Sequence, residues 1–240
     1  MHKLTILMPV FNEEKTIAKI IDRVNAVKLP KGIVKELIII DDGSADNTSS
    51  EIESACKNLS VDTCKMLKHV KNQGKGKAVR TGIKEASGDY IIIQDADLEY
   101  NPEDIKKLIK PVLEKEAEVV YGTRINRLPN LSGEERKPQF LLHYLGNRFL
   151  SLLTSILYGQ WITDMETCYK LFPKKVLSNI PLNSRGFEFE PEITAKLLKQ
   201  NYKIMEIPIK TNPRDMKEGK KLRTFRDGVK ALYTLFLYRF

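Results

Sequence analysis

The sequence has 240 residues, of which 42% are hydrophobic and 30% are charged, and it carries a net charge of +9. This composition excludes a disordered chain, and the length suits one α/β domain with its own core. The positive charge indicates an anionic partner or surface, which nucleic acid, a phosphorylated substrate and acidic lipid would all provide.

Strand and helix patterns alternate through the first half of the chain. A near-continuous apolar run at residues 4–10 predicts a buried strand, and apolar residues at helical spacing from Ile17 to Val24 predict a helix after it. The same reasoning predicts helices that start near Asp46, Gly74 and Asn101, and strands at 36–40, 61–67, 90–94 and 119–122. Such alternation is typical of a mostly parallel sheet with helices on both faces.

The regular alternation stops after residue 122. A polar segment at 125–137 predicts a loop beside a binding site, and residues 140–157 predict a long helix with an apolar stripe. The remaining predicted elements are a strand at 169–172, a helix at 190–200, a strand at 203–209, a basic loop at 213–226 and a C-terminal helix rich in aromatic residues. We therefore expect one domain at 1–225 and an amphipathic helical appendage at 226–240.

Acidic side chains follow three of the predicted strands, at the edge of an open α/β sheet where ligands bind. They are Glu13 after the first strand, Asp41 and Asp42 after the second, and Asp95 and Asp97 after the fourth. Asp95 and Asp97 stand two apart in a bend, so both can aim at one hard cation, which prefers oxygen ligands and often bridges substrate phosphates. Glu99 continues the spacing. A solvated turn is the alternative for so short a pattern.

The cysteines and histidines form no recognisable metal or disulfide pattern. Neither a disulfide framework nor a zinc site is predicted by the spacing of Cys56, Cys64 and Cys168, and we expect a reducing, cytosolic setting. Metal spacing is also absent among the histidines, so we expect surface or core positions for His2, His69 and His143.

Four motifs occur together in the first half: Pro9-Val10-Phe11-Asn12-Glu13, Asp41-Asp42-Gly43-Ser44, Asn72-x-Gly74-Lys75-Gly76-x-Ala78, and Gly88-Asp89-Tyr90 leading to Asp95-Ala96-Asp97. In order and spacing they resemble the family-two glycosyltransferases of GT-A fold, and the resemblance covers nearly the whole chain. Later segments are similar to the dolichyl-phosphate mannose or glucose synthase branch: Gly122-Thr123-Arg124, Gly146-Asn147-Arg148 and Thr163-Asp164-Met165-Glu166-Thr167.

The resemblance implies a single GT-A, Rossmann-like domain that transfers a hexose from a GDP- or UDP-hexose to a polyprenyl phosphate of the dolichyl type. It implies inversion at the anomeric carbon and Mg²⁺ or Mn²⁺ as the cofactor. In this family pattern, Pro9, Glu13 and Asp41 surround the nucleotide base and ribose, and Asp95 and Asp97 hold the metal and the diphosphate. In this branch a third metal ligand follows two residues after the second Asp and is commonly Gln. This sequence departs from that pattern, because Glu99 stands at the position.

Basic residues are expected to hold phosphate groups. The resemblance places Arg124, Arg148 and Arg214 at the phosphates of the donor or the acceptor. Lys75, in the glycine-rich motif, is expected to approach the nucleotide phosphates from an otherwise solvated basic edge. Lys220, in the same basic loop as Arg214, would add a hydrogen-bond donor and help exclude water when that loop closes.

Asp164 distinguishes two classes of acceptor. In both, the departing diphosphate gains negative charge, which a cation at Asp95 and Asp97 would stabilise. If the acceptor is a hydroxyl of a glycan or lipid-linked saccharide, Asp164 acts as the general base. A phosphate acceptor, with its second pKa of about 6, is largely ionised and needs no base. We favour the phosphate, with Asp164 orienting a sugar hydroxyl or a loop; a simple turn aspartate is the remaining alternative.

The helices expected at 140–157 and 226–240 combine apolar and aromatic residues with basic ones, which suits an anionic membrane surface. Packing on the sheet is the alternative. No apolar stretch approaches the roughly 20 residues of a spanning helix. We expect peripheral attachment at the cytosolic face, directly or through a membrane partner. A non-catalytic binder of nucleic acid or another anionic surface is disfavoured, because basic and acidic residues are interspersed and no aromatic-basic motif occurs, so we expect no nucleic-acid partner.

Overall fold

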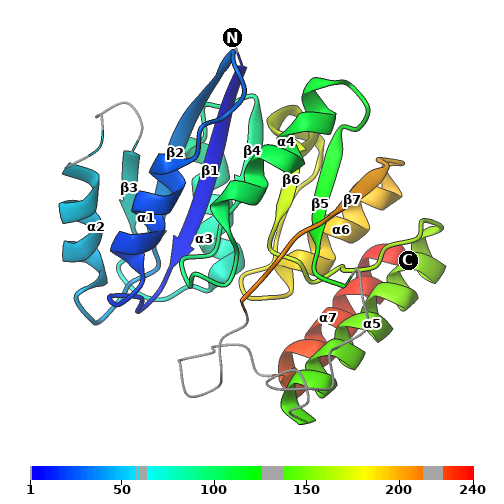
Figure 1. The fold of residues 1–240 in the computed structure, drawn as a ribbon. Helices are drawn as coiled ribbons and strands as arrows, with labels where there is room; N and C mark the ends of the chain where they lie inside the picture. Colours follow the sequence, from blue (N-terminus) through cyan, green and yellow to red (C-terminus); the bar gives the residue numbers. More distant parts are fainter. Residues whose placement is uncertain (1, 58, 60–63, 126–137, 213–223) are drawn as a thin grey trace.

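A seven-stranded sheet forms the centre of the protein (Figure 1). The computed structural model describes residues 2–57, 59, 64–125, 138–212 and 224–240. The strands are β1 (His2–Val10), β2 (Ile33–Asp41), β3 (Cys64–Lys68), β4 (Tyr90–Ile93), β5 (Val119–Thr123), β6 (Lys170–Pro173) and β7 (Ile204–Pro208). The helices are α1 (Ile17–Ala26), α2 (Thr48–Lys57), α3 (Lys75–Glu85), α4 (Ile105–Leu113), α5 (Pro138–Tyr158), α6 (Phe189–Lys199) and α7 (Thr224–Arg239), with short 3₁₀ helices η2 (Pro102–Asp104) and η4 (Lys174–Asn179).

The strand order is β3-β2-β1-β4-β6-β5-β7. β1 pairs in parallel with β2 and β4, β2 with β3, and β5 with β7, whereas β6 is antiparallel to both β4 and β5. The predicted α/β domain with a mostly parallel sheet is therefore confirmed. Because β1, β2 and β4 are parallel, their carboxyl ends meet at one edge and bring together the side chains that follow them.

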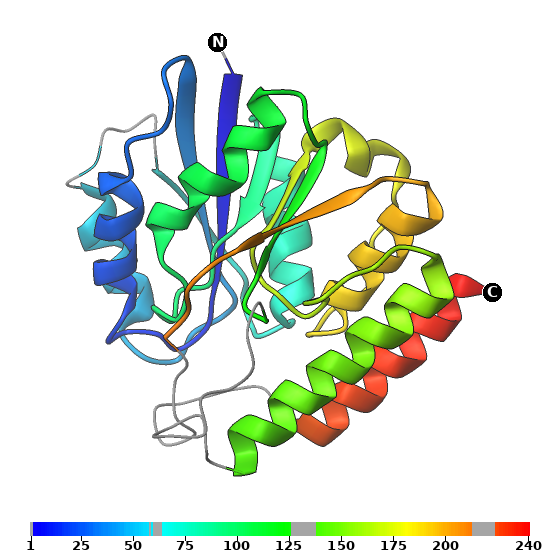
Figure 2. The ribbon, with the colours of Figure 1, turned by 45° about the vertical axis from the view of Figure 1, so that its right-hand side comes forward.

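The central strands are apolar on both faces because helices cover both. Ile38 to Ile40 of β2 and Ile91 to Ile93 of β4 have no exposed surface. α1 and α4 lie on one face of the sheet, and α3 lies on the other (Figures 1 and 2). Strands buried in this way appear in the sequence as continuous apolar runs, which is why they could be predicted.

α5 and α7 lie side by side at the edge of the molecule (Figure 2). Each buries one face, with Leu150 and Thr154 of α5 and Ala231 and Leu235 of α7 largely or wholly inaccessible. Tyr158 Oη donates a hydrogen bond to the Leu235 carbonyl oxygen at 2.7 Å. The predicted long helix and C-terminal helix are therefore present, and both pack on the domain. In the part of the chain that the structure describes, no helix is long and apolar enough to cross a membrane.

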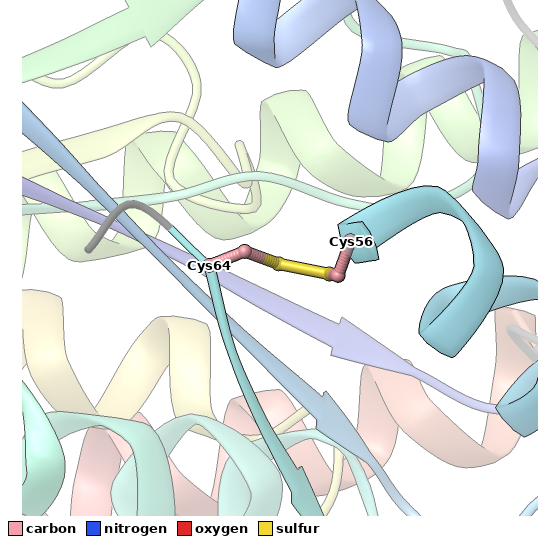
Figure 3. The surroundings of a disulfide bond; sticks show 2 residues. All are labelled: Cys56 and Cys64. Atoms are coloured by element: carbon pink, nitrogen blue, oxygen red, sulfur yellow. A yellow bond between two sulfur atoms is a disulfide. The ribbon is translucent and has the colours of Figure 1, made fainter. Parts of the chain in front are cut away.

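Cys56 and Cys64 form a disulfide that joins the end of α2 to the start of β3 (Figure 3). The prediction that these cysteines form no disulfide is therefore wrong. Their Cα atoms lie 6.0 Å apart because the end of α2 and the start of β3 are neighbours, which cysteine spacing alone does not reveal. Cys168 is buried and free. The cysteine usage consequently gives no basis for expecting a reducing setting.

Candidate active site

Lys75 and Asp95 form an ion pair at the carboxyl edge of the sheet. Lys75 is the first residue of α3, and Asp95 follows β4. Lys75 Nζ lies 2.9 Å from Asp95 Oδ1 and 3.0 Å from Glu190 Oε1. Burial opposes the charge on Lys75, but the Asp95 and Glu190 carboxylates raise its pKa above the ordinary value. Lys75 is therefore a fixed cation beside a predicted metal ligand.

Two glycines allow the segment that carries Lys75 to approach the backbone of residues 184–186. Gly74 has a φ of +96°, and a Cβ added there would lie 2.4 Å from the Arg185 carbonyl oxygen. A Cβ added at Gly76 would lie 2.9 Å from the Gly186 carbonyl oxygen. Lys77 N donates to the Arg185 carbonyl oxygen at 3.0 Å. Only glycine suits the Gly74 position, which fixes the backbone from which Lys75 extends.

Asp95 and Asp97 stand on one bend after β4, and their chemistry suits a hard cation. Asp97 Oδ1 accepts a hydrogen bond from Glu99 N at 3.1 Å. Among the described residues, no three or more His, Cys, Asp or Glu side chains are grouped as a cation site. Mg²⁺ is commonly held by one or two carboxylates, with substrate phosphates and water completing its shell. The two aspartates therefore fit a cation that arrives with a diphosphate, and the ligand roles of Asp95, Asp97 and Glu99 stay predictions.

A second ion pair joins Arg124, after β5, to Asp164. Asp164 is fully buried and accepts hydrogen bonds from Arg124 Nη2 at 2.7 Å, from Arg124 Nε at 2.8 Å and from Asn147 Nδ2 of α5 at 2.7 Å. Arg124 N donates to it as well, at 2.8 Å. Burial alone would raise the pKa of Asp164, but the Arg124 guanidinium and these hydrogen bonds hold it below its ordinary value. This arrangement is suited to orienting Arg124.

Tyr100 lies beside Arg124 and is influenced by the charges of both ion pairs. The Arg124 guanidinium lies 5.9 Å from the centre of the Tyr100 ring, and Cys168 N donates to Tyr100 Oη at 3.0 Å. Burial raises the pKa of Tyr100, and the charges of Arg124, Asp164 and Asp95 all act on it. Both ion pairs therefore belong to one electrostatic environment.

The residues predicted around the nucleotide follow β1 and β2 at the same edge. Pro9 is half-buried near the end of β1, and Glu13 stands three residues beyond that strand. Asp41 has no exposed surface; its Oδ1 accepts from Ser44 N at 2.9 Å, and its Oδ2 accepts from the Ser49 hydroxyl. The sheet thus brings these residues to one edge, while the Asp41 carboxylate is already engaged by Ser44 of the following loop and Ser49 of α2. Contacts with a base and ribose stay predictions.

The other predicted phosphate contacts fall in different places. Arg148 is half-buried on α5, one residue after the Asn147 that binds Asp164. Arg214 and Lys220 lie outside the described residues. The roles of Arg148, Arg214 and Lys220 in holding phosphates stay predictions.

A buried polar cluster next to Lys75 was not predicted. Glu190, in the first turn of α6, is 2% exposed. Glu190 Oε1 is paired with the Lys75 ammonium, whereas Glu190 Oε2, Glu166 Oε1 and Thr167 Oγ1 have no hydrogen-bond partner among the described residues. Burial, and then the Glu190 charge, raise the pKa of Glu166 to about 7. Buried polar atoms without partners indicate a place for water or a ligand. Glu166 and Thr167 lie in the motif at residues 163–167, but no role was predicted for either, and no local pattern marks Glu190.

Residues 5–180 match the protein family described as Glycosyl transferase family 2. The chain belongs to glycosyltransferase family 2. The family expected from the four motifs is thereby confirmed, and with it the general class of enzyme.

Curated relatives of this family-2 glycosyltransferase include two archaeal proteins. A Methanococcus voltae protein, named UDP-N-acetylglucosamine–dolichyl-phosphate N-acetylglucosaminyltransferase, is 32% identical over an alignment of 221 residues, gaps included, that covers 86% of this chain and 84% of that protein. An uncharacterized protein of Methanocaldococcus jannaschii is 30% identical over an alignment of 246 residues, gaps included, that covers 99% of this chain and 92% of that protein.

Solved structures similar to this family-2 glycosyltransferase include glucosyl-3-phosphoglycerate synthase of Mycobacterium tuberculosis. Its complex with Mn²⁺, UDP and glucosyl-3-phosphoglycerate has a TM-score of 0.74 at 19% identity, covering 99% of this chain and 80% of that one. Its complex with Mg²⁺ and UDP has a TM-score of 0.71 at 18% identity, covering 99% and 79%. Similarity at this identity concerns the fold alone, and it confirms the predicted GT-A fold.

Proposed function

We propose that this family-2 glycosyltransferase transfers a hexose or an N-acetylhexosamine from a nucleoside diphosphate sugar to a polyprenyl phosphate of the dolichyl type, with inversion. The Methanococcus voltae relative, whose name joins a UDP-linked sugar to dolichyl phosphate, supports both substrate classes. It also favours UDP over GDP as the carrier and extends the expected sugar from a plain hexose to N-acetylglucosamine.

The buried network around Asp164 is the observation that carries the choice of acceptor. A general base must reach the hydroxyl proton that it takes, with a lone pair available and a pKa near the working pH. Asp164 instead has both oxygens engaged by Arg124 and Asn147, and its pKa is lowered. A phosphate acceptor, with a second pKa of about 6, attacks without a base. The network therefore supports a phosphate over a saccharide hydroxyl.

In the proposed reaction, an acceptor phosphate oxygen bonds to the anomeric carbon while the bond from that carbon to the donor diphosphate breaks. The electron pair of the broken bond stays on the nucleoside diphosphate, and attack from the opposite side inverts the anomeric carbon. Lys75 offers its ammonium to the diphosphate at Asp95, and Arg124, oriented by Asp164, offers guanidinium donors to a phosphate. Mg²⁺ or Mn²⁺ bound at Asp95 and Asp97 would supply further positive charge against the leaving group.

The outward surfaces of α5 and α7 form what we call the α5–α7 apolar face. Its exposed members are Leu142, Leu145, Phe149, Leu152 and Ile156 of α5 and Val229, Tyr233, Phe236 and Leu237 of α7. Exposed basic residues accompany them on α7, namely Arg226, Lys230 and Arg239. A large apolar patch marks an interaction surface, and aromatic and basic residues together suit acidic lipid. We therefore assign this face to peripheral attachment at the cytosolic side of the membrane that holds the acceptor.

Incubation of the purified protein with polyprenyl phosphate in detergent micelles tests the proposal. Separate reactions contain UDP-N-acetylglucosamine, UDP-glucose or GDP-mannose, each with Mn²⁺ or Mg²⁺. We expect one donor to give a solvent-extractable lipid-linked sugar, and EDTA to abolish it. Asp95→Asn and Asp97→Asn should each lower the rate about 100-fold or more, whereas Asp89→Asn, at the opposite edge of the sheet, should not. Transfer to a saccharide hydroxyl without any lipid product would reject the phosphate acceptor.

A further inference from the structure

Asp42, the residue after β2, is buried and holds the loop that leads to Lys75. The residue is 2% exposed. Gly74 N donates to Asp42 Oδ2 at 2.7 Å, and Gln73 N donates to Asp42 Oδ1 at 3.0 Å. These contacts fix both partners, because a buried carboxylate or amide left unpaired is costly. Asp42 therefore sets the position of the residue immediately before Lys75.

His69 fixes Asp42 in turn. His69 Nδ1 lies 2.6 Å from Asp42 Oδ1, and Nε2 lies 3.0 Å from Thr81 Oγ1 of α3. Because a carboxylate oxygen accepts hydrogen bonds, Nδ1 carries the hydrogen and donates a hydrogen bond to Asp42 Oδ1. His69 N also donates to the Asp41 carbonyl oxygen at 2.8 Å, and the residue is 9% exposed. The expectation of an ordinary surface or core histidine misses this pairing.

The backbone on each side of Lys75 is fixed by a hydrogen bond. Asp42 holds one side through Gly74 N, and the Arg185 carbonyl oxygen holds the other through Lys77 N at 3.0 Å. The Lys75 side chain then reaches Asp95 Oδ1 at 2.9 Å. A lysine side chain loses much conformational freedom when it is ordered, and a misplacement of about 1 Å at a reacting group costs about 100-fold in rate. Because the backbone at Lys75 is fixed, both the loss of conformational freedom and the risk of misplacing the ammonium are reduced.

We propose that Asp42 and His69 are positioning residues for the donor diphosphate. They hold the backbone of residues 73–75 so that the Lys75 ammonium stays at Asp95, and neither side chain touches the donor. This role rests on the proposed nucleotide-sugar binding but does not depend on which sugar or acceptor is used.

Isothermal titration calorimetry of UDP with Mn²⁺, on the full chain and its variants, tests this role. His69→Leu, which removes both ring nitrogens, and Lys75→Met are each expected to weaken UDP binding about 10-fold, the scale of one charged hydrogen bond. In the Lys75→Met background, His69→Leu should weaken UDP binding by less than a further factor of about 2, because His69 acts through Lys75. His69→Asn, which keeps an N–H donor near the Nδ1 position, should stay within about 2-fold of the wild type.

The His2 and Asp89 pair offers a matched control. His2 Nδ1 lies 3.6 Å from Asp89 Oδ2, which also accepts from Lys3 N at 2.8 Å, but both side chains are exposed. His2→Leu should leave UDP affinity unchanged. Should His69→Leu fail to fold, Thr81→Val replaces it, since it removes only the hydroxyl at Nε2; we expect a weakening of about 3-fold that disappears in the Lys75→Met background.

Two results would overturn the positioning role while leaving the proposed function intact. One is wild-type UDP affinity in His69→Leu, and the other is equal weakening with and without Lys75. Failure of the wild-type protein to bind either UDP or GDP with Mn²⁺ would instead overturn the proposed function, and the positioning role with it.

Discussion

At the scale of single residues, the contacts of Asp164 favour a role in orienting a neighbouring side chain over a role in taking a proton. Its carboxylate accepts three hydrogen bonds from Arg124 and one from Asn147. We predict that Asp164→Asn lowers kcat/KM about 10- to 100-fold by weakening the hold on Arg124. The pH–rate profile should keep its shape, because its acidic limb belongs to the acceptor phosphate.

Steady-state rates measured between about pH 5 and 9 test this prediction, because a phosphate monoester takes its second ionisation within that range. Asn147→Ala, which removes one of the hydrogen bonds and leaves the Arg124 pair, should cost only about 3-fold. An Asp164→Asn enzyme whose acidic limb disappears would instead identify Asp164 as a general base.

Glu166 gives a prediction about stability. Burial and the Glu190 charge raise its pKa from 4.5 to about 7 in the folded protein. Below pH 4.5 the side chain is neutral in both states; as the pH rises towards 7 the unfolded chain releases the proton first, so the folded state loses stability. We predict that Glu166→Gln removes about 1–3 kcal/mol of this loss. The difference between the melting temperatures of the two proteins should be smallest below about pH 4.5 and should grow up to about pH 8; parallel curves would contradict the raised pKa.

At the scale of elements, the start of α3 depends on a glycine. Gly74 has a φ of +96°, and an added Cβ would lie 2.4 Å from the Arg185 carbonyl oxygen. We predict that Gly74→Ala lowers the free energy of unfolding by about 1–3 kcal/mol and weakens UDP binding, since Lys75 follows directly. Gly146→Ala in α5 is the control, because an added Cβ there meets nothing within 4 Å. It should raise stability by about 0.5–1 kcal/mol, and equal effects in denaturant titrations would contradict the argument.

The spacing of exposed residues on α5 supports an attachment surface. Leu142, Leu145, Phe149, Leu152 and Ile156 recur three and four residues apart and are all exposed. We predict that Phe149→Glu with Leu152→Glu reduces sedimentation with vesicles containing acidic lipid about 10-fold or more, because each change buries a charge in the interface. Val70→Glu, at a fully exposed valine away from this face, should have no effect. Unchanged vesicle binding together with a dimer that the α5 changes dissociate would assign the face to a second copy of the chain.

At the scale of the whole molecule, α5 connects the acceptor chemistry to the proposed membrane surface. Asn147 points inward and donates to Asp164 at 2.7 Å, while Leu145 and Phe149 on either side of it are exposed. A lipid phosphate at Arg124 would therefore lie one helix away from the surface that we assign to the membrane. This geometry suits an acceptor whose head reacts in the protein while its chain stays in lipid.

Much of the fold could be predicted because it depends on local apolar patterns. The continuous runs of β1, β2 and β4, and the helical spacing in α1, follow from burial on a covered sheet. The antiparallel direction of β6 could not be read in this way, since it depends on pairing with β4 and β5. Motif order indicated the family and the carboxyl-edge residues.

The partners of the site residues could not be predicted, because they come from elements distant in the sequence. Lys75 meets Asp95 and Glu190 only after α3, β4 and α6 are packed together. Likewise, the pairing of His69 with Asp42 depends on adjacent strands β2 and β3, and no spacing rule reveals it.

Phosphorus-31 NMR of the lipid product, combined with the proton coupling of its anomeric carbon, tests whether the sugar is transferred to a phosphate with inversion. Transfer to a polyprenyl phosphate converts a phosphate monoester into a glycosyl phosphodiester whose anomeric configuration is opposite to that of the donor. We predict both signals in the product of the wild-type enzyme. An unchanged monoester signal beside a new glycosidic bond to a hydroxyl, or a retained anomeric configuration, would contradict the proposed reaction.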